Sequence, residues 1–438
     1  MKRWRTDRPA YYGCCVAAAL AVLVASGTAG PSGFAFADSA VHPESSLSPA
    51  KLERISDYLR HEIATGKIPG SVMLIQQHDT PVYSTCFGVR DVVGQRPMTP
   101  DTIFRWYSMS KPITSVAIMM LVEDGKLALD DPIEKYIPAF DDARVGIDTL
   151  DDKGEPMLTL EPLHRSITIE DLLRHTSGIT YGIYGDDPAR KRYAAADLFN
   201  GNFDNAELAD RIAHLPLAEQ PGTLWDYGHS DDVLGRVVEV VSGKSLLEFE
   251  RERLLGPLGM KDTAFYATDP AEHSRIAEPM PNDRNVLPVV GIRDPRQVRR
   301  SESGGAGMVG TITDYAKFAQ MLLNGGEFEG RRYLSANTIA LMTRDHIGPQ
   351  SGIARDRYYW PGDASGYGLG FAVRTKLMAN EPGPIGEYRW DGVAGTFFWI
   401  DPTDDMFVIF MAQTPTQRGR IQSELRKLVY DAFENEGR

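Results

Sequence analysis

The chain has 438 residues, of which 42% are hydrophobic and 24% are charged, and these proportions are typical of soluble globular proteins. They exclude an intrinsically disordered chain. The formal net charge of −13 also excludes a general nucleic-acid or anionic-lipid surface, because both repel an acidic protein. The length allows two or three domains, or one domain interrupted by a large insertion.

Residues 1–37 are predicted to be a secretory signal peptide. They combine a basic start, an apolar run from Cys14 to Ala25 and a small-residue cleavage site at Ala35-Phe36-Ala37. No later stretch reaches the roughly 20 apolar residues of a membrane span. We therefore expect export to the periplasm or the medium, with no membrane span in the mature chain; a retained signal anchor is the alternative.

The first elements of the mature chain are predicted to be a helix, a strand hairpin and a buried helix. Ser48 and the following Pro have the residue types of a helix start, and apolar residues keep helical spacing through residue 63. Two short apolar runs within residues 70–89 surround a polar turn, which predicts a hairpin. Residues 113–122 are apolar almost all round, so we expect that helix inside the core.

Later in the chain, helical patterns come first and strand patterns follow. Helices are predicted at 169–175, 206–214, 233–241, 246–255, 313–323 and 420–433, and strands at 367–374, 387–390, 396–400 and 406–412. Strands at both ends of the chain suggest one antiparallel sheet completed by the two termini. The predicted fold is α+β, of the α/β sandwich type: residues 44–140 plus 301–438 form a sheet domain flanked by helices, and residues 141–300 form an inserted, mainly helical domain.

Ser-x-x-Lys occurs at Ser48 to Lys51 and at Ser108 to Lys111, and about one or two matches are expected by chance in a chain of this length. The context separates the two copies. Capping of a surface helix explains Ser48, whereas Pro112 fits only the first turn of a helix, so the buried helix must begin close to Ser108. Capping with a solvent-reaching lysine remains the structural alternative for the second copy.

Ser108 and Lys111 have the spacing of a nucleophile and its activating base. Three residues apart, they share one helix face. The positive end of the helix dipole favours the anionic transition states of acyl transfer. Burial disfavours the charged form of a lysine, so Lys111 can act as a base near neutral pH.

A polar loop at Trp225-Asp226-Tyr227-Gly228-His229 leads into an apolar helix and offers Tyr227 as a proton relay. The free pKa of a tyrosine is near 10, so Tyr227 needs a positive neighbour before it can act as a base. The alternative is purely structural, with Tyr227 packed on Trp225 and Asp231 capping the helix. A lipase-type nucleophile elbow needs Gly at position 232, where the chain has Asp.

Trp390-Asp391-Gly392-Val393 lies between two predicted strands, where small residues allow a substrate close to the backbone. The amide of Val393 could join that of Ser108 in an oxyanion hole. A bulged hairpin without a catalytic role is the alternative.

Other patterns are read as structural. Residues 305–310 match a dinucleotide fingerprint in spacing, but no strand precedes them, and the histidines lack metal-ligand spacing. We therefore expect no cofactor and no metal. The basic residues Arg293, Arg296, Arg299 and Arg300 are interpreted as a solvated loop.

The order of Ser108-Met109-Ser110-Lys111, Tyr227 before a Val-Leu-Gly helix, and Trp390-Asp391-Gly392 resembles the serine β-lactamase-like family, which includes class C β-lactamases, DD-peptidases and family VIII carboxylesterases. Residues 172–178 and 304–308 resemble its supporting segments. The resemblance implies an active site at the junction of a sheet domain and a helical domain. By position it makes Ser108 the nucleophile, Lys111 and Tyr227 the acid/base pair, and Val393 an oxyanion donor.

Two departures from the family pattern bear on the substrate. Trp390 stands where the lactamases usually have a Lys that holds a carboxylate, and His229 stands where they usually have Asn. Both changes resemble the esterase branch, so we expect a small-molecule ester substrate. Hydrolysis of β-lactams or D-alanyl peptides is the enzymatic alternative, and a penicillin- or cell-wall-peptide-binding protein without turnover is the alternative of another class. The sequence leaves the oligomeric state open.

Overall fold

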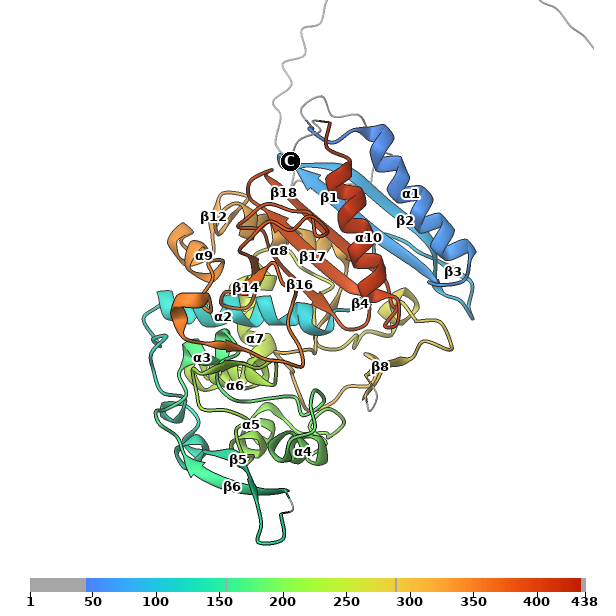
Figure 1. Cartoon of the computed structure of the whole chain (residues 1–438). Helices are drawn as coiled ribbons and strands as arrows, with labels where there is room; N and C mark the ends of the chain where they lie inside the picture. Colours follow the sequence, from blue (N-terminus) through green and yellow to red (C-terminus); the bar gives the residue numbers. More distant parts are fainter. Residues whose placement is uncertain (1–44, 155, 288–289, 435–438) are drawn as a thin grey trace, which may run out of the picture. The chain divides into compact units, whose positions relative to one another are not determined.

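The computed structural model describes residues 45–154, 156–287 and 290–434, all of which belong to one compact unit spanning residues 35–438 (Figure 1). The signal peptide predicted at 1–37 lies outside the described residues. Among the described residues, no helix has the length and apolar character needed to cross a membrane.

An eight-stranded antiparallel sheet combines strands from both ends of the chain. Its order is β14 (Ser365–Tyr367), β15 (Ala372–Arg374), β16 (Tyr388–Gly392), β17 (Thr396–Asp401), β18 (Met406–Met411), β1 (Gly70–Gln77), β2 (Thr80–Asp91) and β3 (Arg96–Pro97). The two ends meet where β1 pairs with β18, from Val72 opposite Met411 to Gln77 opposite Met406. The predicted antiparallel sheet is confirmed.

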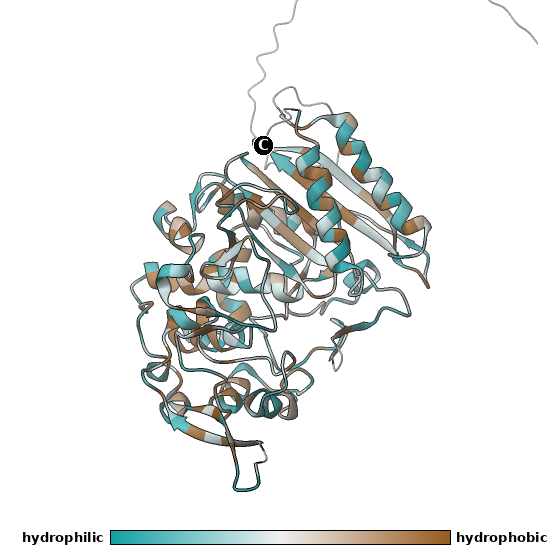
Figure 2. Cartoon of the chain, in the orientation of Figure 1, coloured by the Kyte–Doolittle hydropathy of each residue, from teal (hydrophilic) through white to brown (hydrophobic). Residues whose placement is uncertain are grey.

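Helices α1 (Pro49–Ala64) and α10 (Arg418–Asp431) lie side by side on one face of this sheet (Figure 1). Apolar side chains of both helices form one core cluster with β1, β17 and β18. Figure 2 shows hydrophobic residues along the strands and hydrophilic residues on the outer faces of the helices. Ser48 is the N-cap of α1 as predicted, but its hydroxyl makes no capping hydrogen bond.

On the other side, α8 (Ile312–Leu323) contacts β1, β17 and β18. Helix α2 (Lys111–Glu123) packs against α6 (Ser230–Ser242) and α7 (Leu246–Glu250), and its residues from Lys111 to Leu121 are all buried. A 3₁₀ turn, η1 (Tyr107–Ser110), leads into α2 and contacts β16. The start of α2 therefore lies close to both the sheet and the helices of the middle of the chain.

The remaining elements are α3 (Ile169–Leu173), α4 (Pro188–Ala195), α5 (Asn205–Ala213), a π-helical turn (Arg251–Leu255), α9 (Ala336–Met342), the hairpin β5 (Arg144–Leu150) and β6 (Pro156–Pro162), and the short strands β4 (Phe104–Arg105), β7 (Leu224–Trp225), β8 (Asn285–Leu287), β9 (Val290–Gly291), β10 (Val309–Gly310), β11 (Glu327–Phe328), β12 (Arg331–Arg332) and β13 (Ala354–Arg355). The sequence did not predict α4, α9 or the β5–β6 hairpin. The division into a sheet domain and an inserted helical domain stays a prediction.

One predicted strand is wrong. Residues 367–374 are not a single strand, because they comprise the end of β14, a turn at 368–371 and the strand β15. Gly370 has φ +94°, which only glycine adopts readily, and a Cβ at Gly368 would lie 2.1 Å from the backbone oxygen of Met342. The close approach of Met342 and the left-handed Gly370 therefore reverse the chain here.

Candidate active site

The site begins at the turn that carries Ser108. Tyr107, the residue before it, has φ +49°, a left-handed conformation that costs a non-glycine residue on the order of 1–3 kcal/mol. The hydroxyl of Tyr107 accepts a hydrogen bond from the backbone N–H of Arg293 at 3.0 Å, which helps to hold this conformation. Lys111 then opens α2 with Pro112 in the first turn, so the helix begins where the sequence predicts.

Lys111 is fully buried and surrounded by oxygen acceptors. Its Nζ lies 3.3 Å from Ser108 Oγ, 2.9 Å from the Tyr181 hydroxyl and 2.7 Å from the carbonyl oxygen of Gly305. Burial lowers the pKa of Lys111 below the usual range of a lysine, although nearby carboxylates, including Asp231, partly oppose the shift. A neutral amine beside the serine hydroxyl can accept its proton.

Tyr227 completes the group around Ser108. Its hydroxyl lies beside Ser108 and accepts a hydrogen bond from the indole N–H of Trp390 at 3.3 Å. Nζ of Lys111 lies 4.7 Å from the centre of the Tyr227 ring. Burial raises the pKa of Tyr227 well above the usual value, so the resting side chain is a neutral phenol that can pass a proton but does not start as a base.

The predicted oxyanion segment lies beside the serine turn. A Cβ on Gly392 would lie 2.1 Å from the backbone oxygen of Trp106, so only glycine allows this approach of β16 to the turn. The hydroxyl of Thr396 donates to the same oxygen at 3.2 Å. Val393 consequently lies at the site and lines the hollow in front of Ser108.

This hollow, here called the serine hollow, has a volume of about 560 Å³, part of which is open to solvent. Its walls are mainly apolar or aromatic, and the residues that line it are Tyr107, Ser108, Tyr181, Ile183, Tyr184, Phe199, Tyr227, Val286, Arg293, Ala306, Tyr359, Asp391, Val393 and Arg418. The positive charge of Arg418 is offset by Asp391, whose carboxylate lies 3.7 Å away. A second cation, Arg293, lines the same hollow, so the hollow suits a partly apolar molecule and keeps one positive charge that Asp391 does not offset.

Two residues predicted to bind substrate lie elsewhere. Trp390 is only 2% exposed and stands behind Tyr227 instead of lining the serine hollow. His229 is also buried, with Nδ1 2.8 Å from Asp232, and lines a neighbouring hollow. Trp390 therefore contacts Tyr227 and does not line the serine hollow, because β16 turns its side chain toward the Tyr227 hydroxyl.

Sequence reasoning missed Tyr181 and the role of the loop at Gly305. Asp232 accepts hydrogen bonds from the Ser303 hydroxyl at 2.5 Å and from the Gly305 N–H at 3.2 Å, which positions the Gly305 carbonyl for Lys111. Asp231 does not cap α6 but lies 3.2 Å from Nε2 of the buried His175. The N–H groups of a buried lysine need acceptors in either protonation state, and that requirement could have prompted a search for the oxygens around Lys111.

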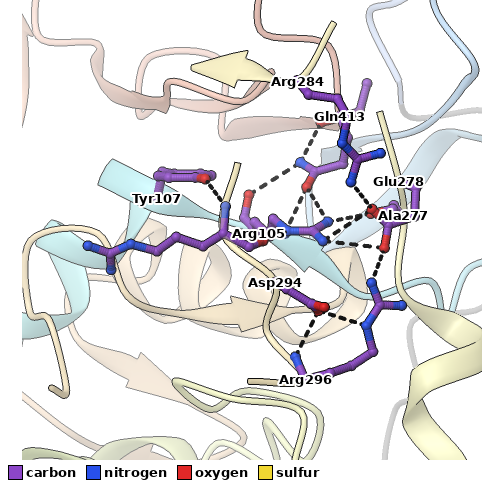
Figure 3. Close-up of polar contacts among 10 residues, drawn as sticks. Arg105, Tyr107, Ala277, Glu278, Arg284, Asp294, Arg296 and Gln413 are labelled. Carbon is purple, nitrogen blue, oxygen red and sulfur yellow. Dashed lines mark hydrogen bonds and ion pairs between the residues drawn. The ribbon is translucent and has the colours of Figure 1, made fainter. Parts of the chain in front are cut away.

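Residues 293–300 lie in a loop, as interpreted, but the side chains of its arginines are bonded to other residues. Arg296 pairs with Asp294 and Glu278, and Arg105 lies on the other side of Glu278, 3.3 Å from its carboxylate (Figure 3). The side chain of Arg105 also donates to the backbone oxygens of Arg293 and Ala277 and to Gln413. This buried network fixes the segment whose amide holds Tyr107.

Further along, Arg300 pairs with Asp204 and Glu207, and Arg299 donates to the backbone oxygen of Asn200. Among the described ranges, no group of three or more His, Cys, Asp or Glu side chains is arranged to hold a metal ion.

Comparisons with known proteins agree with this geometry. A model of the β-lactamase family matches residues 55–431. Esterase EstB of Burkholderia gladioli is 29% identical over 408 residues, which cover 87% of this chain and 95% of that protein. Lovastatin esterase of Penicillium rubens is 32% identical over 299 residues, covering 66% and 72%.

Solved structures give the same result. EstCE1, a hydrolase with promiscuous acyltransferase activity, has a TM-score of 0.71 at 28% identity and covers 87% of this chain and 98% of its own. Simvastatin synthase LovD from Aspergillus terreus, at 22% identity and a TM-score of 0.70, covers 88% and 99% and shows the shared fold. The family match covers most of the chain, and Ser108 lies within reach of Lys111 at the start of a buried helix. This chain belongs to the β-lactamase/transpeptidase-like family and is a serine hydrolase.

Proposed function

We propose that the protein is an exported carboxylesterase that works through an acyl-enzyme on Ser108. The observation that carries the proposal is the position of one serine hydroxyl 3.3 Å from Lys111 Nζ and beside the Tyr227 side chain, in a hollow with mainly apolar or aromatic walls. A nucleophilic hydroxyl beside groups that can accept and return its proton is an arrangement that suits acyl transfer.

In the first half of the reaction, Ser108 Oγ attacks the ester carbonyl while its proton passes to neutral Lys111, directly or through the Tyr227 hydroxyl. The carbonyl oxygen becomes an anion, for which the amides of Ser108 and Val393 are the proposed donors. The C–O bond of the ester then breaks, and the alcohol leaves with the proton returned through Tyr227.

In the second half, water takes the place of the alcohol. Its oxygen attacks the acyl carbon while its proton passes to the same pair of side chains, and these return the proton to Ser108 Oγ as the bond from that oxygen to the acyl carbon breaks. The products are the carboxylic acid and the free serine hydroxyl, so the cycle needs no cofactor.

Three features favour an ester over a β-lactam or a D-alanyl peptide. Trp390 supplies no positive charge for a substrate carboxylate, because an indole is uncharged, and its single N–H already donates to Tyr227. The walls of the serine hollow are mainly apolar or aromatic, which suits the uncharged groups of an ester. The relatives named as esterases, EstB and lovastatin esterase, support the same substrate class.

The test is turnover of p-nitrophenyl acetate and butyrate by the protein without residues 1–37, compared with its Ser108→Ala variant. We expect the parent to release p-nitrophenol and the folded variant to lose at least about 1,000-fold in kcat/KM, since the nucleophile is gone. Equal activity of the two proteins would reject Ser108 as the nucleophile. Turnover of a chromogenic cephalosporin but not of esters would favour the lactamase alternative, and stoichiometric labelling without product release would favour the binding protein.

A further inference from the structure

A second hollow adjoins the serine hollow. It has a volume of about 400 Å³, part of which is open to solvent, and we call it the His229 hollow. The two hollows share four wall residues, Tyr181, Phe199, Arg293 and Ala306. A molecule bound in front of Ser108 is therefore separated from the second hollow only by these side chains.

His229 is a polar wall residue of this hollow, and only one of its two ring nitrogens has a hydrogen-bond partner among the described residues. The side chain is only 3% exposed and packs against two rings, that of Tyr181 at 4.6 Å and that of Phe199 at 4.9 Å. Nδ1 is bonded to Asp232, whereas no residue in the described ranges offers a hydrogen-bond partner to the buried Nε2. A buried polar atom without a partner is unfavourable, and a ligand that pairs with it is stabilised.

The contacts of Asp232 fix which nitrogen of His229 carries the proton. Its Oδ1 accepts hydrogen bonds from the Ser303 hydroxyl and the Gly305 N–H, and although burial alone would raise its pKa, the neighbouring donors and Lys111 hold the pKa of Asp232 below the usual range, so Oδ2 is an ionised acceptor too. Nδ1 of His229 must then be the donor across the 2.8 Å contact. In the neutral ring this leaves Nε2 as an acceptor, ready for an O–H or N–H donor.

The rest of the hollow limits the kind of donor. Leu198, Phe203 and Leu208 supply apolar walls that suit an alkyl chain. Arg293 lines the same hollow, and its positive charge disfavours an ammonium group. A hydroxyl group fits both polar neighbours, because it can donate to Nε2 and accept from a guanidinium.

We propose that the His229 hollow is a subsite for a hydroxyl group carried by the ester substrate, with its O–H donating to Nε2 of His229 and its alkyl chain lying against the apolar walls. The substrate class is then a carboxylic ester with a hydroxyl-bearing arm. This inference rests on the proposed ester hydrolysis through Ser108 and adds a specificity-determining residue to it.

The test compares methyl alkanoates with the matching methyl ω-hydroxyalkanoates, with acyl chains of 6, 8 and 10 carbons. The quantity compared is the kcat/KM of the hydroxylated ester divided by that of its unsubstituted partner. At one or more chain lengths we expect the parent to favour the hydroxylated ester by about five- to tenfold, the effect of one hydrogen bond. His229→Asn keeps a donor toward Asp232 but removes the outward nitrogen, so the ratio should fall to about one. His229→Gln places its amide near the position of Nε2 and should restore part of the preference. His214→Asn changes an exposed histidine and should keep the parent ratio.

A parent ratio of one at every chain length would overturn the inference, as would a preference that survives in His229→Asn. Binding measured by calorimetry separates this inference from the proposed function. The Ser108→Ala protein should bind the hydroxylated ester more tightly than its partner, and adding His229→Asn should abolish the difference. Undiminished turnover by Ser108→Ala would reject the Ser108 mechanism, while the binding difference would still decide the role of His229.

Discussion

At the scale of single residues, Lys111 links burial to the pH dependence of the reaction. Its pKa lies below the usual range because the side chain is fully buried, and Asp231, Asp232 and Asp391 partly oppose this shift. The neutral amine is the form that accepts a proton. The fraction of active enzyme therefore rises with pH through the lowered pKa of Lys111 and levels off above it.

Asp391→Asn should move this acidic limb to lower pH. The variant removes a negative charge that favours the protonated lysine, so the pKa of Lys111 falls further. The measurement is kcat/KM for p-nitrophenyl acetate as a function of pH. Asp142→Asn, a change at an almost fully exposed side chain, should leave the profile in place. A shift of the limb to higher pH in Asp391→Asn would contradict Lys111 as the base.

Tyr181 is expected to position Lys111. Its hydroxyl lies 2.9 Å from Nζ, and Tyr181→Phe removes that acceptor while keeping the ring beside Tyr227. We expect kcat for p-nitrophenyl butyrate to fall about tenfold with little change in KM, which corresponds to about 1.4 kcal/mol. Tyr184→Phe removes another hydroxyl from the wall of the serine hollow and serves as the matched control. Equal losses in both variants would reject a specific role for Tyr181.

At the scale of elements, regular patterns were predictable and close approaches were not. The buried helix α2 and the hairpin of β1 and β2 follow from apolar periodicity, which depends only on neighbouring residues. The strong polarity of α4 hides its helical period, although Asp187 caps it at the backbone N–H of Arg190. The contact of Tyr181 with Lys111 joins residues 70 positions apart, so no local pattern could indicate it.

The network around Arg105 shows how the segment at 293–296 is held against the serine turn (Figure 3). Glu278→Gln would leave the buried Arg105 guanidinium without its main opposite charge. We expect the free energy of unfolding in urea to fall by roughly 3 kcal/mol, the usual cost of breaking a buried ion pair. Glu161→Gln, at an exposed position on β6, should change it by less than about 0.5 kcal/mol. A similar small change in Glu278→Gln would show that the network adds little to stability.

At the scale of the whole described chain, the two ends are joined by more than the pairing of β1 with β18. The backbone N–H of Ser48 donates to the carbonyl oxygen of Ala432 at 2.8 Å, and that of Glu434 donates to Ser46 at 3.0 Å. Residues 45 and 434 can therefore be connected by a short linker without moving the sheet. The tip of the hairpin between β5 and β6, at Asp152 and Lys153, is exposed and offers a site for new termini.

A circular permutant that starts at Lys153, runs through residue 434, continues through a short Gly/Ser linker to residue 45 and ends at Asp152 should fold and keep most of the p-nitrophenyl butyrate turnover expected of the parent. The break lies in an exposed turn, whereas the elements that position Ser108, Lys111 and Tyr227 remain continuous. Circular dichroism and p-nitrophenyl butyrate turnover provide the readouts. A second permutant opened between Ile118 and Met119 breaks the buried helix α2 and should fail to fold. If both permutants failed, the order in which the chain ends enter the sheet, and not only their final pairing, would be required for folding.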